Sequence, residues 1–272
     1  MARSFWLHTV LLGWGVGLAG TFLLSKAFDG STARGAATTV LVMQPLLLLL
    51  WAWSVTGATV SAMRHVARGE GRGWGLVTLA VLSLAVLGMT ATLPRVVPSL
   101  AQHWRVARGE QPTEDFRIDL LQGGRTVAFR GGVNDGAAIA LDRAIGDAPV
   151  VGTVLLESPG GWLREGDRMA DVVRRYRLNT RVEGDCFSAC TLVMLAGANR
   201  SVGPAARIGF HRGRGLGDLG DGDRRPASRS ETELYRKAGL RDDVVQRIVR
   251  TPSGTLWIPT HDELRRADIV NR

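Results

Sequence analysis

Hydrophobic residues dominate the first hundred positions of the chain, where three long uncharged runs follow one another. The runs cover about residues 5–25, 38–62 and 73–94. Each reaches the roughly 20 residues that an α-helix needs to cross a bilayer. The arginines of this region flank the runs, as expected because an arginine at the bilayer centre costs roughly 2.5–3.5 kcal/mol. The pattern predicts a membrane region over residues 1–100 with three transmembrane helices.

Two other interpretations of these runs are open. The first run follows Arg3 and could be a cleavable signal peptide, although a signal core usually has only about 7–15 apolar residues. A buried helical core of a soluble protein is the second alternative, which three successive runs disfavour. The loop 64–72 is the more basic of the two loops between the runs. The positive-inside rule places this loop in the cytoplasm, and three spans then place the rest of the chain outside it.

Beyond residue 100 the pattern changes to short elements. Residues 101–115 are polar and predict a linker. Residues 116–272 then alternate β-rich runs with segments of helical periodicity. The predicted strands are 125–130, 150–156, 180–183 and 206–210. The predicted helices are 134–145, 162–176 and one that starts within 183–197. A last helix is predicted after the capping box Thr260–Glu263. Such alternation predicts an α/β domain with a mostly parallel sheet.

The net charge of +9 comes almost entirely from arginine, because Lys26 and Lys237 are the only lysines. The arginines are interleaved with acidic residues, as in "GDRMADVVRRYR". A nucleic-acid surface would show a basic stripe with aromatic residues between the charges, and the sequence contains none. We therefore expect a solvated surface and membrane flanks, with the lipid bilayer as a partner and no nucleic acid.

Candidate chemistry gathers where predicted strands end and helices begin, the usual place for ligands in parallel sheets. "SPGG" (158–161) follows one strand, "CFSAC" (186–190) follows another, and His211 follows the last. From the pattern alone, Ser188 is either a helix N-cap or a nucleophile. The glycine pair is either a turn or a loop that approaches a ligand closely, and His211 is either a surface residue or a base.

The order of these motifs resembles a known family, the proteolytic subunit of Clp protease. "FRGGV", a helix, a strand into "SPGG", a helix, "CFSAC" before "LVMLAG", and "ARIGFHR" follow one another at similar intervals from about Arg125 to His211. The closing "LWIPTHDELRRADIV" is similar to that family's last helix. The resemblance covers most of residues 116–272 and none of the membrane region. Signal-peptide peptidase A and NfeD-type membrane peptidases are more distantly similar.

The resemblance implies a crotonase-like spiral domain of α/β class and serine peptidase chemistry, with no cofactor and no metal ion. It implies that Ser188 is the nucleophile, that His211 is its base, and that the amides of Gly161 and Ala189 form the oxyanion hole. It also implies self-association, because relatives of this fold commonly form rings or stacked trimers.

The chain departs from the family in two ways. The family has an aspartate before its last helix, whereas residues 251–256 contain no acid. The candidates elsewhere in the chain are Asp218, Asp221, Asp223 and Asp243. The membrane relatives pair their serine with a lysine, which makes Lys237 an alternative base, although it also fits a solvated helix position beside Arg236.

Cys186 and Cys190 stand on either side of Ser188. A disulfide between them is allowed if the domain is extracytoplasmic, and the distance is feasible because Cys186 precedes the helix that Cys190 begins. Such a bridge would stiffen the turn that carries Ser188. The alternative is a pair of small buried apolar residues. Two cysteines without a nearby histidine pair make a poor zinc site.

Two functional hypotheses follow. The first is an ATP-independent serine endopeptidase, anchored in the inner membrane with its domain on the periplasmic side, that cleaves peptides or unfolded or membrane protein segments. The second is a catalytically weak or inactive peptide-binding module at the membrane, which the missing aspartate favours. Acyl-thioester chemistry on the same fold is a weaker third hypothesis, since such enzymes do not need a serine–histidine pair.

Overall fold

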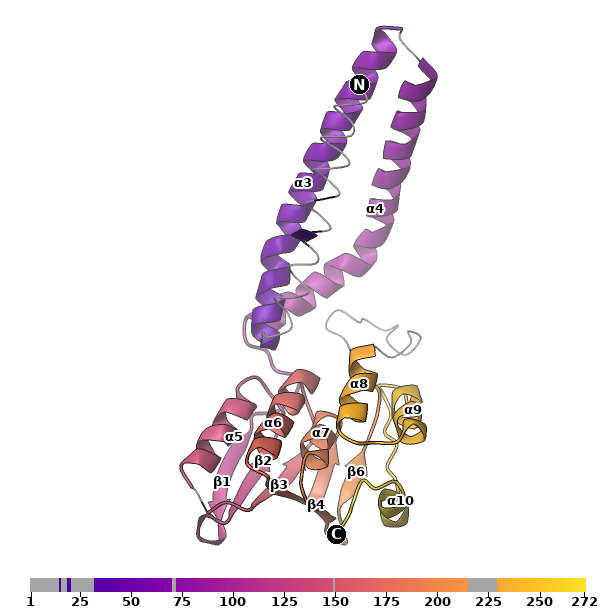
Figure 1. Ribbon diagram of the computed structural model, residues 1–272. Coiled ribbons are helices and arrows are strands. Elements are labelled where there is room, and N and C mark those ends of the chain that lie inside the picture. Colours follow the sequence, from indigo (N-terminus) through magenta and orange to yellow (C-terminus); the bar gives the residue numbers. More distant parts are fainter. Residues whose placement is uncertain (1–14, 16–18, 21–31, 70–71, 149, 215–228) are drawn as a thin grey trace. The chain divides into compact units, whose positions relative to one another are not determined.

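The computed structural model describes residues 15, 19–20, 32–69, 72–148, 150–214 and 229–272 (Figure 1). The chain divides into two compact units, Met1–Gly109 and Glu110–Arg272. The boundary between them falls within the linker predicted at 101–115. Most of the first predicted span, 5–25, lies outside the described residues.

Helix α3 (Ala33–Ala67) contains the second predicted span. It begins at Thr32, whose hydroxyl accepts the N–H of Gly35 at 3.1 Å and so satisfies one of the free donors of the first turn. It ends before Gly69, which adopts a left-handed conformation that favours glycine. By length and composition, α3 could cross a membrane.

Helix α4 (Arg72–Ala107) extends further than the third predicted span and bends by 52° between Gly75–Ala91 and Val96–Ala107. Pro94 and Pro98 lie inside it, and proline bends a helix because it lacks an N–H and clashes with the preceding turn. Taken together, the two parts are also long and apolar enough to cross a membrane. The described residues therefore contain one helix that could cross a membrane, or two, and not the three that were predicted.

The predicted linker was wrong at its beginning, since Ala101–Ala107 continues α4. His103 and Val106 are buried, one turn apart on the same side of the helix. Burial of these two residues is consistent with a packed helix and not with an exposed linker.

The second unit contains a six-stranded sheet of order β1-β2-β3-β4-β5, with β6 also paired to β4. Only β1 is antiparallel, so the prediction of a mostly parallel sheet is confirmed. The strands are β1 (Arg117–Leu121), β2 (Thr126–Arg130), β3 (Thr153–Ser158), β4 (Asn179–Phe187), β5 (Arg200–Val202) and β6 (Arg207–Gly209). The short strands β1 and β5 were not predicted, because each has at most one clearly apolar face.

Strand β4 is nine residues long, more than twice the predicted 180–183, and this length positions the site. Its first half pairs with β5, and Asp185–Phe187 at its end pair with β6. Against β3, the register shifts between the pairs Leu156–Val182 and Ser158–Cys186. Such an irregularity turns the end of a strand relative to its beginning. The "CFSAC" motif thus leaves the sheet between the ends of β3 and β6.

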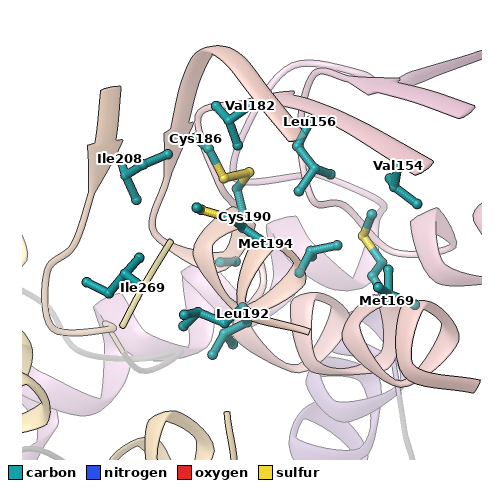
Figure 2. Packing of buried hydrophobic residues seen from close by; sticks show 14 of the residues in the cluster. Val154, Leu156, Met169, Val182, Cys186, Cys190, Leu192, Met194, Ile208 and Ile269 are labelled. Carbon is teal, nitrogen blue, oxygen red and sulfur yellow. A yellow bond between two sulfur atoms is a disulfide. The ribbon is translucent and has the colours of Figure 1, made fainter. Parts of the chain in front are cut away.

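Helices α5 (Ala137–Gly146), α6 (Leu163–Arg175) and α7 (Ala189–Leu195) lie along one face of the sheet (Figure 1). All three agree with the predicted helices to within a few residues. The core lies between this layer and the sheet, and it includes Val182, Cys186 and Ile208 on the strands and Met194 on α7 (Figure 2). Buried residues alternate with exposed ones along β3 and β4, as expected for a sheet with one covered face.

In the described residues, three helices follow the sheet: α8 (Arg229–Lys237), α9 (Asp242–Arg250) and α10 (His261–Arg266). The capping box predicted for the last helix is confirmed. The Thr260 hydroxyl accepts the N–H of Glu263 at 3.3 Å, and the Glu263 carboxylate accepts the N–H of Thr260 at 2.8 Å.

Candidate active site

Ser188 lies in a sharp turn between β4 and α7, in a backbone conformation that residues with a side chain rarely adopt. Its φ is 53° and its ψ is −124°. A serine that caps a helix has extended backbone angles and accepts an N–H with its hydroxyl, whereas Ser188 makes no such side-chain bond. Backbone strain of this kind costs roughly 1–3 kcal/mol and is often found at active sites. The geometry therefore disfavours the capping interpretation of Ser188.

Two contacts hold this turn in place. The N–H of Ser188 donates to the carbonyl of Gly209, the last residue of β6, at 2.9 Å. A disulfide joins Cys186 at the end of β4 to Cys190 in the first turn of α7, with the two Cα atoms 5.4 Å apart (Figure 2). Both cysteines are buried in the core. The backbone at Ser188 is therefore held by a hydrogen bond and by a disulfide between the residues on either side of it, while Ser188 itself is partly exposed.

The glycine pair after β3 packs directly against this turn. A Cβ atom on Gly160 would lie 2.7 Å from Cβ of Ser188 and 3.2 Å from the nitrogen of Ala189. Gly160 also has a φ of +98°. Only glycine allows both the left-handed backbone and this approach.

The peptide N–H of Gly161 faces the same turn. Val133 donates its N–H to Gly160 at 2.7 Å and accepts the N–H of Trp162 at 2.8 Å. In a parallel pair of strands, one residue hydrogen-bonds to the two neighbours of the residue opposite it. The N–H and C=O of that opposite residue then point away from the paired strand. Val133 continues from β2, and β3 lies between β2 and β4. The N–H of Gly161 therefore points toward the β4 side, where Ser188 and Ala189 lie.

Ala189 supplies a second N–H, because it is the first residue of α7 and its amide has no partner within the helix. The structure thus brings together Ser188, the N–H of Ala189 and the loop of Gly161, three of the residues predicted from the sequence. This arrangement could stabilise an oxyanion that forms when Ser188 attacks a carbonyl group.

His211 leaves the sheet at the same edge. Gly209 pairs with Phe187, and each strand continues to its candidate residue, Ser188 after β4 and His211 after β6. The residues around His211 are firmly held: Phe210 and Trp257 exchange two backbone hydrogen bonds of 2.9 and 2.8 Å, and Arg212 donates to Thr251 at 2.9 Å.

The His211 side chain is partly exposed, and its Nδ1 atom is buried. Ser188 and His211 thus follow the ends of two paired strands, β4 and β6. Catalytic hydrogen bonds are often long in unliganded sites and shorten when substrate binds.

Lys237, the alternative base, has a different environment. Its ammonium group lies 3.5 Å from Asp167 and 3.4 Å from Asp171 on α6, and about half of its side chain is exposed. The pKa of Asp171 is lowered, because hydrogen bonds and charge from Arg174 and Lys237 outweigh its partial desolvation. This is a solvated ion-pair environment, unlike the buried environment in which a lysine acts as a base.

Of the four aspartates considered as orienting acids, the structure describes Asp243. Asp243 is exposed and pairs with Arg241 at 3.1 Å, and a hydrogen bond from this arginine lowers its pKa. Asp218, Asp221 and Asp223 lie outside the described residues.

No family model and no curated protein matches the chain. Among solved structures, it is similar to ClpP1 from Listeria monocytogenes, with 21% identity and a TM-score of 0.43 over 54% of this chain and 92% of that chain. It is also similar to a mutant form of that ClpP1, with 20% identity and a TM-score of 0.42 over 54% of this chain and 89% of that one.

One buried acid near the site was missed by the sequence analysis. Glu231 in the first turn of α8 is 4% exposed, and its carboxylate accepts the N–H of Gly213 at 2.6 Å. Gly213 lies two residues after His211. Burial raises the pKa of Glu231, and the bond from Gly213 and the charge of Arg212 partly offset this effect. Nothing in the sequence distinguished Glu231 from the acidic residues of the glycine-rich segment before it.

A second buried residue of α8 lies near the turn that carries Ser188. Tyr235 is fully buried next to Thr191, and burial raises the pKa of its hydroxyl. The Thr191 hydroxyl donates to the carbonyl of Ser188 at 2.7 Å. Helix α8 thus packs against both segments that carry the candidate catalytic residues. In the part of the chain that the structure describes, no group of three or more His, Cys, Asp or Glu residues is arranged to hold a metal ion.

Proposed function

We propose that this protein is a membrane-anchored serine endopeptidase of the Clp-like type, which works without ATP on peptides or on unfolded or membrane protein segments. The observation that carries the proposal is the strained turn at Ser188. Ser188 is held at φ 53° beside the N–H of Ala189 and the loop of Gly161. Acyl transfer requires a nucleophile and oxyanion donors that lie close together, so this arrangement supports the proposal.

In the proposed reaction, the Ser188 oxygen attacks the carbonyl carbon of the substrate while the His211 ring takes the hydroxyl proton. The N–H groups of Gly161 and Ala189 donate to the resulting oxyanion. Collapse of this intermediate breaks the C–N bond, and the leaving amine takes the proton from His211. A water molecule activated by the same ring then hydrolyses the acyl-enzyme and restores Ser188.

We propose further that the domain faces the periplasm and that the protein assembles as a homo-oligomer. The Cys186–Cys190 disulfide supports an oxidising compartment, because such bonds are rare in the cytosol. Alkaline phosphatase fused after Arg272 should be active in a bacterial host, whereas a green fluorescent protein fusion should stay dark. The opposite pair of results would contradict the proposed orientation. Light scattering of the detergent-solubilised protein measures its oligomeric state.

A fluorophosphonate probe tests the catalytic proposal on the purified full-length protein. We expect covalent labelling that Ser188→Ala abolishes and that His211→Ala slows by about 10²–10⁴-fold, the usual contribution of a general base. Ser201→Ala on β5 and His261→Ala on α10 are matched controls that should label normally. Labelling that survives Ser188→Ala would refute the assignment of the nucleophile.

A peptide-binding module is the second candidate function. The absence of an acid in residues 251–256 favours it. In that case the protein would not react with the probe but would still bind unfolded peptides, and Gly161→Ala would weaken this binding because its Cβ would lie 2.3 Å from the carbonyl of Val133.

A further inference from the structure

The first residues of the second unit lie against the loop that carries Gly160 and Gly161. The segment Gln111–Asp115 runs beside the loop Gly131–Asp135, which follows β2. The N–H of Gly132 donates to the carbonyl of Glu114 at 3.2 Å. A Cβ atom on Gly132 would lie 2.1 Å from the Thr113 hydroxyl and 2.4 Å from the carbonyl of Glu114. The two segments are therefore too close for any residue but glycine at this position.

Asn134 is the centre of this contact. Its side chain is almost fully buried, with 2% exposed. Its amide nitrogen donates to the carbonyls of Thr113 at 3.2 Å and Glu114 at 2.8 Å, and its amide oxygen accepts the Thr113 hydroxyl at 2.9 Å. Both amide hydrogens and the oxygen are thus used. A buried polar group satisfied in this way specifies one arrangement of the segments that it joins.

The same segment also contacts the residues on both sides of Gly161. The Thr113 hydroxyl lies 3.4 Å from the carbonyl oxygen of Gly160. The Gln111 side-chain oxygen accepts the indole N–H of Trp162 at 3.1 Å and the N–H of Asp135 at 3.3 Å. Segment Gln111–Asp115 therefore holds two neighbouring loops together.

The connection to the oxyanion donor passes through one residue. Val133 directly precedes Asn134, and its N–H and C=O bond to Gly160 and Trp162. These two bonds orient the peptide of Gly161 away from Val133 and toward the Ser188 turn. Fixing Asn134 fixes Val133, and Val133 in turn fixes the direction of the Gly161 N–H.

We propose that Thr113 and Asn134 are positioning residues that hold the Gly161 N–H in place for catalysis. This inference rests on the proposed function. The segment that follows the membrane region would then be part of the catalytic apparatus and not a passive tether. Loss of one oxyanion donor typically lowers the rate about 10²–10³-fold, so a misdirected donor should cost part of that factor.

The test compares variants of the full-length protein in the fluorophosphonate reaction, with the maximal rate of inactivation separated from probe affinity. Thr113→Val removes the hydroxyl at nearly constant volume, and Thr113→Ser keeps it. We expect the valine variant to lower the maximal rate about tenfold with little change in affinity, and the serine variant to restore it. Asn134→Asp, which places a charge against two carbonyls, should lower the rate further. Asn199→Asp is the matched control, since the Asn199 amide donates to Asn179 at the other end of β4.

A second readout does not depend on catalysis. Hydrogen exchange of the backbone amides in residues 160–162, followed by mass spectrometry, should be at least tenfold faster in Thr113→Val than in the parent protein or in Asn199→Asp. An unchanged exchange rate would overturn the inference even if the protein does not react with the probe. An unchanged maximal rate in Thr113→Val, with normal labelling of the parent, would also overturn it while leaving the proposed function intact.

Discussion

Gly160 and Ser188 are packed so closely that a methyl group on Gly160 would lie 2.7 Å from Cβ of Ser188. These residues come from different strands and are 28 positions apart. The contact places the loop of Gly160 directly against the turn that carries Ser188, and no side chain lies between the loop and the turn. The distance between the proposed oxyanion hole and the serine is therefore set by backbone packing.

Replacing Gly160 by alanine should damage both the fold and the reaction. The new Cβ would clash with the Ser188 turn, and a φ of +98° is strained for alanine, so we expect the free energy of unfolding to fall by at least about 1–3 kcal/mol. Probe labelling should be lost. Pulse proteolysis measures the first effect. Gly254→Ala is the control, because no atom outside its two chain neighbours lies within 4 Å of its Cβ position, and it should leave both quantities unchanged.

Removing the disulfide should loosen the turn at Ser188. The bridge closes a loop of only about five residues, so the chain-entropy model predicts a loss of about 2 kcal/mol in the double variant Cys186→Ala, Cys190→Ala. We also expect slower probe labelling, since Ser188 would no longer be held between two fixed residues. Denaturant unfolding with and without a reductant provides the measurement. A reductant that slows labelling in the double variant as much as in the parent would show that its effect does not come from this bridge.

Glu231 should give the protein a characteristic pH dependence. Because burial raises the pKa of this group in the folded state, the folded protein binds the proton more tightly than the unfolded chain. Its contribution to stability is complete below the unfolded pKa, near 4.5, and is lost as the pH rises through the raised folded pKa. The melting temperature of the parent should therefore fall relative to that of Glu231→Gln as the pH rises. A difference that is constant with pH would contradict the prediction.

Lys237→Ala should leave probe labelling nearly unchanged. The lysine is half exposed and pairs with Asp167 and Asp171, and exposed ion pairs usually contribute about 0–1 kcal/mol. We therefore expect a small loss of stability and a maximal inactivation rate within about twofold of the parent. A loss of labelling as large as that of His211→Ala would instead make Lys237 the base.

The alternation of strands and helices could be predicted from the sequence because hydrophobic periodicity is a local property. Strands β2, β3 and β6 and helices α5, α6 and α7 follow the predicted pattern within a few residues. Strand β1 could not be predicted, because its alternation of partly buried and exposed residues is too weak to distinguish from a loop. The bend of α4 was missed because a proline can end a helix or only bend it, and packing decides which.

The candidate site shows the same division. Ser188, Gly161 and His211 could be singled out, because polar or glycine residues directly after buried strands are recognisable in a sequence. Their expected roles, and that of Ala189, came from the resemblance to the Clp protease subunit. Glu231, Asn134 and Thr113 could not, because each is an ordinary polar residue until the fold buries it. Their importance depends on partners that lie 18–21 positions away in the chain.

The sequence by itself determined the order of elements and the residue types at each strand end, since these depend on neighbours a few positions away. Only the tertiary structure decided the left-handed backbone of Ser188, the direction of the Gly161 N–H and the burial of Glu231. The physical reason is that strain, peptide orientation and desolvation are imposed by contacts between segments that are distant along the chain.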